Sequence, residues 1–429
     1  MNHLHYLRIG AAVLAAASMA ACSSPTTPGS ATTSASATSA SASGTSTSAS
    51  ATATAAADGS VKDVPWDKVG PGWILAQWSA ATPHRPGEKP EPGEPTAETA
   101  AATVYLVDPS AKRYAITTLE PGSGLELVDW SGDGSRALFA TPGGGPTSAL
   151  LVDLRTGDQT TVPVSGFPRF TRPDGTALLV WTSFNGKQPG TLKRIDLQGN
   201  TQQEYPTDEL GGAGPFNGGY LESPDGTQLV LGTANLGNEV VARADNSLVV
   251  LGNDGTVIRT LAAPMPAAMC RPVRWWTPQT VLAHCTEEKS SANQLWEVPL
   301  DGSAPTALTA VNSGQQDDPA FGGDLGDDDA WKLPSGTFLQ SLGAGCSRFL
   351  SRLSSDGHTT RVKVPNVAPG AVVTGVTNGR LVLLDQANCG GTTALVSFDP
   401  AANTSTVLLG PPVNGGSVSQ ALLYPDAGS

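Results

Sequence analysis

The sequence is poor in the residues that most catalytic centres need. It contains five histidines among 429 residues, and they are far apart: His3, His5, His84, His284 and His358. This spacing does not supply neighbouring ligands for a histidine metal centre or the base of a Ser–His–Asp triad. No G-x-S-x-G nucleophile elbow occurs, which argues against a serine hydrolase. The sequence therefore identifies no catalytic residue, and we expect no cofactor.

Positive charge and long apolar runs are also scarce. Asp and Glu number 38 against 25 Lys and Arg, which gives a formal net charge of −13 spread along the chain. A diffuse acidic surface argues against nucleic acid or anionic lipid headgroups as the main partner. The apolar run at 11–21 is too short to span a bilayer and is typical of a secretion signal. We expect residues 1–21 to be a signal peptide and the protein to be exported.

The signal ends at a cysteine that follows small residues. The sequence MAAC at 19–22 resembles the lipobox of bacterial lipoproteins, although Met19 stands where that family usually has Leu. The resemblance implies that Cys22 is acylated, for example with palmitate, and holds the protein at the outer face of the cell membrane. The alternative is ordinary signal cleavage near ASMAA with an incidental cysteine.

The segment after Cys22 consists almost entirely of Ser, Thr and Ala up to Asp58. It has no aromatic and almost no large apolar residue, so it cannot bury enough surface to offset its ordering entropy. We expect residues 22–58 to be a lipidated cysteine followed by a disordered tether. The root-mean-square reach of such a tether is roughly 30–35 Å.

A turn followed by an apolar strand recurs along the rest of the chain. It reads SGDGSRALFA at 131–140, RPDGTALLVW at 172–181 and SPDGTQLVLG at 223–232, with looser copies at 277–285 and 333–342. Pro sets φ in such a turn, Asp binds backbone amides, and Gly tolerates the positive φ of a bulged hairpin. The pattern predicts one strand–turn–strand unit built many times.

A second hairpin with an Asp/Gly turn accompanies each unit. Seven copies occur at intervals of 43 to 56 residues, centred on residues 108, 153, 196, 252, 299, 352 and 397. Four short strands at this period are typical of a β-propeller, in which each blade buries its faces against its neighbours. We expect residues 59–429 to form one all-β propeller of seven four-stranded blades. Six blades are the alternative, because the last three units lack a full S-P-D-G.

The repeat also resembles a known family. The pattern WSGDGSRALFA…ALLVDLRTGD resembles the repeat of TolB-type propellers, and the lipobox with its tether resembles actinobacterial TolB-like lipoproteins. The propeller resemblance covers about residues 62–425. It implies an architecture more than a function, because such propellers include both binding proteins and enzymes.

Long connections are expected at one end of the propeller. With strands labelled A to D from the axis outward, 80–101 and 233–246 are B–C loops and 312–329 is a D–A connection. Both kinds of connection lie at the end opposite the short A–B turns. Insertions gathered on one face of a repeat protein usually mark its binding face. We expect this loop-rich face to bind a protein or envelope polymer, with drift at tolerant loops as the alternative.

An acidic run lies in the last of these connections. Its candidate calcium ligands are Asp324, Asp327 and Asp329 in DLGDDD. The run lacks the alternating spacing of a defined calcium loop, so we expect a solvated acidic loop and no metal site.

Three tryptophans are expected at equivalent places, Trp66, Trp130 and Trp276. Each is predicted to end an A strand just before its turn. Packing between blades is favoured for these rings over a platform for sugars.

Four cysteines remain after Cys22. An even number in an exported domain suggests two disulfides. The hairpin that turns at TPQT brings Cys270 near Cys285 if the strand carries a small bulge. Cys346 and Cys389 fall in equivalent B–C loops of neighbouring blades. We therefore predict the pairs Cys270–Cys285 and Cys346–Cys389, with four buried free thiols as the alternative.

Two classes of function fit these features. The favoured one is a monomeric, surface-anchored propeller that binds its partner without catalysis. The other is an envelope hydrolase or lyase that uses carboxylates at the mouth of the central channel. Converging carboxylates in an axial pocket would favour the enzyme, and a channel lined by apolar and small residues would favour binding.

Overall fold

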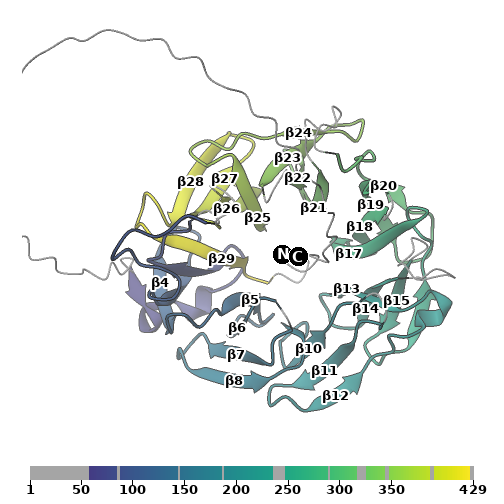
Figure 1. Cartoon of the computed structure of the whole chain (residues 1–429), viewed down its shortest axis with the longest axis horizontal. Coiled ribbons are helices and arrows are strands. Elements are labelled where there is room, and N and C mark those ends of the chain that lie inside the picture. The colour runs from purple at the N-terminus through teal and green to yellow at the C-terminus, as the bar shows by residue number, and fades with distance from the viewer. Residues whose placement is uncertain are drawn as a thin grey trace, which may run out of the picture. The chain divides into compact units, whose positions relative to one another are not determined.

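The computed structural model describes residues 58–425 except 85–86, 144, 186–187, 235–246, 288–289, 316–324, 344–346 and 387–390. The expected signal peptide, Cys22 and nearly all of the expected tether therefore lie outside the described residues. Within them the chain forms seven antiparallel four-stranded sheets arranged around a central axis (Figure 1), one of which gains a short fifth strand. The prediction of an all-β propeller with seven blades is confirmed.

Blades 2 to 7 each use four consecutive strands, ordered from the axis outward. Blade 2 contains β5 (Glu126–Trp130), β6 (Arg136–Ala140), β7 (Ser148–Asp153) and β8 (Gln159–Pro163). Blade 3 contains β9 (Phe167–Phe170), β10 (Ala177–Trp181), β11 (Leu192–Asp196) and β12 (Thr201–Glu204). Blade 4 contains β13 (Phe216–Glu222), β14 (Gln228–Thr233), β15 (Leu248–Gly252) and β16 (Val257–Thr260), preceded by the 3₁₀ helix η3 (Leu210–Gly212).

The next three blades follow the same plan. Blade 5 contains β17 (Ala268–Thr277), β18 (Thr280–Glu287), β19 (Asn293–Pro299) and β20 (Thr306–Ala307). Blade 6 contains β21 (Gly326–Leu333), β22 (Gly336–Leu342), β23 (Arg348–Leu353) and β24 (Thr359–Arg361). Blade 7 contains β25 (Gly370–Thr377), β26 (Arg380–Gln386), β27 (Leu395–Asp399) and β28 (Thr404–Leu409).

Blade 1 is built from both ends of the propeller. Its innermost strand is β29 (Ser417–Leu423), which pairs with β2 (Ile74–Ser79); β3 (Ala102–Val107) and β4 (Arg113–Leu119) follow. A short strand, β1 (Gly59–Ser60), adds to the outer edge of β4 in parallel. The predicted place of Trp66 is therefore wrong. Trp66 lies in the 3₁₀ helix η2 (Trp66–Lys68), after η1 (Val61–Asp63), because the C-terminal strand takes the innermost position.

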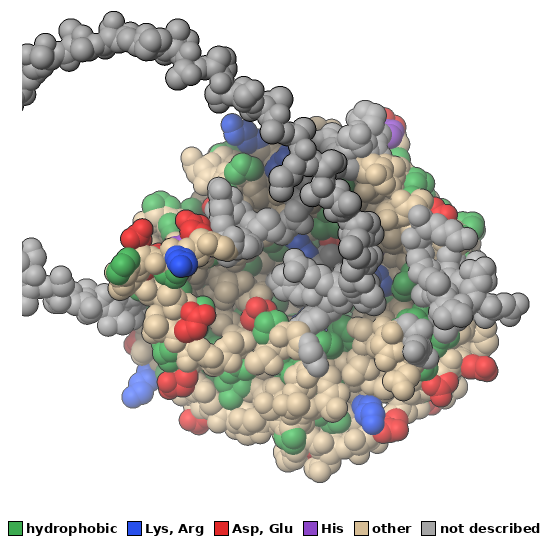
Figure 2. Space-filling view, viewed as in Figure 1, with side chains coloured by type: hydrophobic (Ala, Val, Ile, Leu, Met, Phe, Trp, Pro, Cys, Tyr) green, Lys and Arg blue, Asp and Glu red, His purple; other side chains and the backbone are tan. Residues whose placement is uncertain are grey.

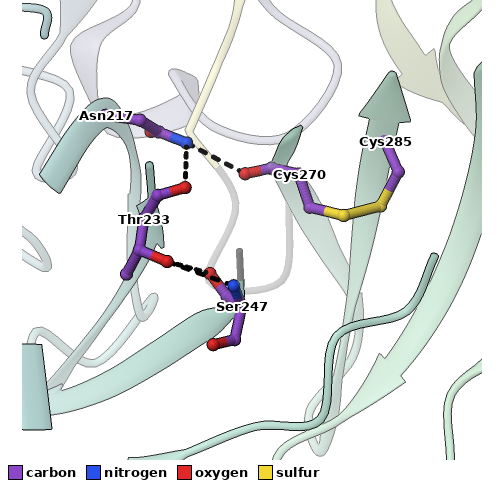
Figure 3. Close-up of a disulfide and its surroundings, with 5 residues drawn as sticks. All are labelled: Asn217, Thr233, Ser247, Cys270 and Cys285. Atoms are coloured by element: carbon purple, nitrogen blue, oxygen red, sulfur yellow. Dashed lines mark hydrogen bonds between the residues drawn. A yellow bond between two sulfur atoms is a disulfide. The ribbon is translucent and has the colours of Figure 1, made fainter. Parts of the chain in front are cut away.

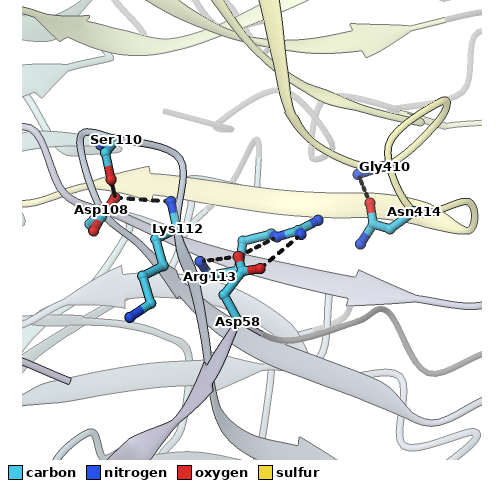
Figure 4. A network of polar contacts seen from close by, with 7 residues as sticks. All are labelled: Asp58, Asp108, Ser110, Lys112, Arg113, Gly410 and Asn414. Carbon is cyan, nitrogen blue, oxygen red and sulfur yellow. Dashed lines mark hydrogen bonds and ion pairs between the residues drawn. The ribbon is translucent and has the colours of Figure 1, made fainter. Parts of the chain in front are cut away.

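An ion pair ties the first described residue to blade 1. The Arg113 Nε atom lies 3.1 Å from Asp58 Oδ2, and the backbone N–H of Arg113 donates to the same oxygen over 3.0 Å (Figure 4). The hydrogen bond from the Arg113 side chain holds the pKa of Asp58 below its usual value. The chain is thus attached to the outer edge of blade 1 from residue 58 onward.

Turn chemistry separates the blades into two groups. In blades 2 and 4 the serine of the A–B turn donates to the aspartate two residues later, over 2.6 Å in both Ser131–Asp133 and Ser223–Asp225. Blades 5 to 7 have A–B turns of two residues, one of them Asn378–Gly379 with positive φ at both positions. These short turns explain the missing S-P-D-G, and they leave A strands of eight to ten residues.

The apolar core is divided among the contacts between neighbouring blades, which we call seams. Each of the seven seams contains one cluster of buried apolar side chains drawn from the two blades it joins. A single blade would leave both faces of its sheet in water, so the repeats stabilise one another. Trp130 belongs to the cluster between blades 1 and 2 and is 1% exposed, which confirms its packing role.

Charge on the face viewed in Figure 1 is spread over the propeller. Figure 2 shows acidic side chains distributed around the rim without a single dominant patch. No helix within the described ranges is both long enough and apolar enough to cross a membrane.

Candidate functional site

The described residues form a pocket of about 430 Å³ at one end of the central channel. Its walls come mainly from the last residues of A strands and from the turns that follow, so it lies at the end of the short A–B turns. The residues that line it are Gly72, Asp129, Trp130, Arg172, Arg274, Trp275, Trp276, Ala330, Trp331, Lys332, Thr374, Gly375, Val376, Thr377, Leu422, Leu423, Tyr424 and Pro425. The loop-rich face expected from the sequence is at the opposite end.

An ion pair between blades 2 and 3 forms one side of the pocket. Arg172 Nη2 lies 3.1 Å from Asp129 Oδ1, and Arg172 Nη1 donates to the carbonyl oxygen of Trp130 over 3.2 Å. The second carboxylate oxygen of Asp129 accepts the backbone N–H of Phe170 over 2.8 Å. Burial alone would lower the pKa of Arg172, but the charge of Asp129 raises it overall. Asp129 is therefore held by fixed donors on both of its oxygens.

A second carboxyl group lies on the other side of Arg172. The backbone N–H of Arg172 donates to Glu222 Oε2 over 2.8 Å. Burial raises the pKa of Glu222 to about 7, and its Oε1 atom is buried without a hydrogen-bond partner among the described residues. Burial also raises the pKa of Tyr220, two residues earlier on the same strand. A carboxyl group whose pKa is near neutral therefore lies beside Arg172, although it does not line the pocket itself.

Two further ion pairs cross from blade 5 to blade 6. Arg274 donates to both oxygens of Asp329, each over 2.6 Å, and its guanidinium lies 4.5 Å from the centroid of the Trp331 ring. Arg271 Nη2 lies 3.3 Å from Asp328 Oδ1. Burial raises the pKa of Asp328, and this effect is opposed by the charges of Arg271 and Arg348.

These contacts correct the interpretation of the acidic run. Asp327 and Asp329 lie in strand β21 and are 3% and 6% exposed, so the expected solvated loop is wrong for them. They are buried because each has a partner: Asp327 accepts the Ser341 hydroxyl over 2.5 Å, and Asp329 pairs with Arg274. Asp324 lies outside the described residues. In the part of the chain that is described, no group of three His, Cys, Asp or Glu residues is placed to hold a metal.

The remaining pocket walls are aromatic and apolar. Lys332 Nζ lies 4.2 Å from the centroid of the Trp276 ring, and the Trp130 ring meets Tyr424 edge to face at 5.3 Å. Gly375, Val376 and Leu422 supply a smooth surface on the side of blades 7 and 1. Trp276 thus ends an A strand as predicted, but it also lines a pocket.

Converging carboxylates were expected for an enzyme, and a lining of apolar and small residues was expected for a binding protein. The pocket has each of these features only in part. One carboxylate, Asp129, lines it directly, and that carboxylate is already bound by Arg172. Much of the opposite wall is apolar or small. Sequence reasoning missed this site because its residues are brought together from six blades. The sequence did contain one pattern that could have indicated the pocket, namely Trp and Arg residues near the ends of the predicted A strands.

The structure contains a disulfide between Cys270 and Cys285, one of the two predicted pairs. The two residues are direct partners across β17 and β18, and register shifts nearer the turn bring them opposite each other. Close by, Asn217 of blade 4 donates to the carbonyl oxygen of Cys270 over 3.0 Å (Figure 3). Cys346 and Cys389 lie outside the described residues, so their pairing stays a prediction.

The three histidines beyond the signal lie in different places. His284 is on β18, where burial and the charge of Arg271 lower its pKa well below the usual value. His358 is in the turn between β23 and β24, and His84 lies in the loop after β2, 3.2 Å from Glu94. The structure does not bring them together.

The long connections join the strands that the sequence indicated. Residues 80–101 connect β2 to β3, and 234–247 connect β14 to β15, both as B–C loops. The connection into blade 6 is shorter than expected, because β21 already begins at Gly326. Residues 235–246 and 316–324 lie outside the described residues, so the binding role of this face stays a prediction.

No protein-family model and no curated protein matches this sequence. Solved structures that resemble it include the propeller domain of the Trilobed protease from Pyrococcus furiosus, with 12% identity, a TM-score of 0.47, and coverage of 80% of this chain and 95% of that one. TolB from Acinetobacter baumannii shows 16% identity, a TM-score of 0.40, and coverage of 67% and 64%. A TolB of Agrobacterium tumefaciens shows 14%, 0.38, and coverage of 68% and 88%. The neighbours thus include TolB proteins and other β-propellers, and at this identity the likeness concerns the fold alone.

Proposed function

We propose that this protein is a lipid-anchored β-propeller that binds a partner in the cell envelope and performs no chemistry on it. The observation that carries the proposal is the state of the carboxylates around the axis. Asp129, Asp328 and Asp329 each have an arginine partner, so none is a free base beside a second free acid. These carboxylates fix how neighbouring blades meet and leave a seven-bladed platform.

The anchor is the first part of this proposal to test. In the Cys22→Ala protein, acylation has no thiol to use, so the protein should move from the membrane fraction to the soluble fraction and lose lipid labelling. Two or three acyl chains anchor stably, whereas one binds only marginally. Met19→Leu, which restores the usual lipobox residue, is the matched control and should retain the protein at the membrane. Unchanged membrane retention of Cys22→Ala would exclude lipid anchoring.

Partner binding is tested with the same soluble Cys22→Ala chain. It should capture a specific component from envelope extracts, and replacing residues 84–98 or 314–324 by short turns should weaken that capture. Residues 84–98 fall between the bounds of β2 and β3, and residues 314–324 end before β21 begins, so both replacements should leave the described strands intact and preserve folding. If shortening the A–B turns abolishes capture while both loop replacements do not, the loop-rich face is not the recognition surface.

A second candidate function is an envelope hydrolase or lyase, and Glu222 is the observation that favours it. A carboxyl group with a pKa of about 7, whose Oε1 atom has no hydrogen-bond partner in the described part of the chain, has the protonation behaviour of a general acid near neutral pH. Purified cell-wall polysaccharide should then release new reducing ends with the wild-type protein and not with Glu222→Gln. Equal release, or no release with either protein, would contradict the enzyme.

A further inference from the structure

We propose that Arg271 and Arg348 bind a singly charged oxyanion of an acidic polysaccharide at the loop-rich end of blades 5 and 6. This site rests on the proposed function and assigns a chemical class to the envelope partner. Arg271 lies near the start of β17, and Arg348 is the first residue of β23 (Figure 1). A strands and C strands both begin at the end of the propeller that carries the D–A and B–C connections, so the two arginines lie at that end.

The two arginines have one carboxylate as a common charged neighbour. Arg271 Nη2 lies 3.3 Å from Asp328 Oδ1. Burial lowers the pKa of Arg348, an effect opposed by the charge of Asp328 and increased by the charge of Arg271. His284, opposite Arg271 on β18, adds no charge near neutral pH because burial lowers its pKa well below the usual value. The three charged groups are therefore close together, and an added negative charge would be favourable beside Arg348.

This cluster contains one positive charge more than it can balance. Two guanidinium groups stand against the single Asp328 carboxylate, in a protein whose net charge is −13. No other carboxylate within the described ranges lies at ion-pairing distance from Arg271 or Arg348. A carboxylate or a phosphodiester brings one negative charge and balances the cluster, whereas a terminal phosphate brings about two. The planar guanidinium also matches both oxyanions in shape.

The unused N–H groups of both arginines can reach a ligand. The Arg271 side chain is 26% exposed and donates to Asp328 through Nη2. The half-buried Arg348 side chain donates to no other described residue, and only its backbone N–H donates, to Gln386. No guanidinium nitrogen of either residue is among the buried unpaired atoms, so the unused donors face solvent. The unpaired Oδ2 atom of Asp328, by contrast, is buried and does not face a ligand.

The exposed surface favours a sugar polymer over a protein as the carrier of the oxyanion. Protein interfaces have a buried core that is rich in aromatic and apolar side chains. In the part of the chain that is described, the exposed large apolar side chains are Ile258, Val311 and Val413, which lie in or after the outer strands of three different blades. They do not form an apolar patch. A hydroxylated chain needs hydrogen-bond partners instead, so an acidic polysaccharide fits this surface.

The test is isothermal titration of the purified Cys22→Ala chain with three polymers. Alginate carries carboxylates on its sugars, its propylene glycol ester keeps the sugars without the charge, and phosphomannan carries phosphodiesters. At least one charged polymer should bind saturably and at least about tenfold more tightly than the ester, because the ester cannot form charged hydrogen bonds with a guanidinium group. The net charge of −13 opposes nonspecific binding of polyanions, so saturable binding indicates a local site.

Matched arginine variants locate the binding. Arg348→Gln should weaken the charged polymer about tenfold and leave the ester unchanged. Arg348→Lys keeps the charge but not the planar donors, and it should weaken binding less. The control is Arg352→Gln, which should change nothing. It removes an exposed arginine from the other half of the same strand, where the side chain donates to the carbonyl oxygen of Ser335 over 2.6 Å. Unchanged melting temperatures establish that each variant is folded.

Four results would overturn this assignment: no saturable binding of either charged polymer, binding no tighter than that of the ester, equal losses in Arg348→Gln and Arg352→Gln, or an envelope partner that protease destroys. Which charged polymer binds decides between a carboxylate and a phosphodiester. Capture from envelope extracts is measured separately on the loop replacements. A chain that captures a component but binds neither polymer refutes the polysaccharide site and leaves the proposed function standing.

Discussion

Two seams of the propeller are held together in different ways. The seam between blades 5 and 6 has four buried apolar residues in its cluster and two arginine–aspartate pairs across it. The seam between blades 7 and 1 has twelve such residues. No ion pair between described residues crosses that second seam. Of these two seams, the one with the smaller apolar cluster is the one that contains the charged pairs.

The difference shows what each kind of contact contributes. Apolar contact stabilises in proportion to the area removed from water and accepts many arrangements of the two surfaces. A buried ion pair adds little net stability because both charges must be desolvated, yet losing one partner is costly. The arginine–aspartate pairs therefore fix how blade 5 meets blade 6 more than they strengthen that contact.

The largest expected effect comes from breaking one of these pairs. Arg274→Met leaves the carboxylate of Asp329 buried without its partner and should lower the free energy of unfolding by about 3–5 kcal/mol. Urea denaturation measures this. Arg274→Met combined with Asp329→Leu should recover most of the loss. Arg380→Met removes a partly exposed pair inside blade 7 and is the control, with at most about 1 kcal/mol expected. Equal losses of unfolding free energy in Arg274→Met and Arg380→Met would contradict the expectation that the buried pair matters more than the partly exposed one.

Glu222 lies at the seam between blades 3 and 4, where its carboxyl group accepts the backbone N–H of Arg172. Its contribution to the stability of the folded protein should depend on pH. Its folded pKa of about 7 is raised above the usual value of 4.5. Between these values the folded state keeps a proton that the unfolded chain releases, so stability falls as pH rises and the loss is complete above about pH 7.

The shift corresponds to about 3–4 kcal/mol. Glu222→Gln should therefore be more stable than the wild type at pH 8, by about this amount, and should lose the pH dependence. Thermal unfolding from pH 5 to pH 8 measures it. The control is Glu204→Gln, which removes an exposed carboxylate paired with Lys193 and should leave the profile unchanged. A parallel profile for Glu222→Gln and wild type would exclude a neutral Glu222.

The smallest effect is expected at the apolar seam. A Cβ atom on Gly375 would lie 2.4 Å from Leu423 Cδ1, so Gly375→Ala should overpack the contact between blades 7 and 1 and cost about 1–3 kcal/mol. The loss should not depend on salt concentration, unlike that of a charged seam. Adding Leu423→Val should restore part of it. Gly70→Ala is the control, because a Cβ atom there meets no other atom within 4 Å.

Local signals explain which features the sequence predicted. The seven hairpins carry their own turn residues, and the bulged hairpin at TPQT already placed Cys270 near Cys285. The innermost strand of blade 1 was missed because its pairing with β2 joins distant parts of the chain and leaves no local pattern. Asp329 was misplaced because a run of acidic residues normally indicates a solvated loop, and only the arginines of blade 5 make its burial favourable.

The pairing of β29 with β2 has a consequence for how the protein folds. Partners such as Gln77 and Gln420 lie near opposite ends of the propeller sequence, so ring closure must order almost the whole chain before this contact forms. Until β29 is in place, the inner edge of β2 lacks a partner, and an unpaired strand edge is a template for association with other chains. Pairing of β29 with β2 is then the step that closes the ring and covers this edge.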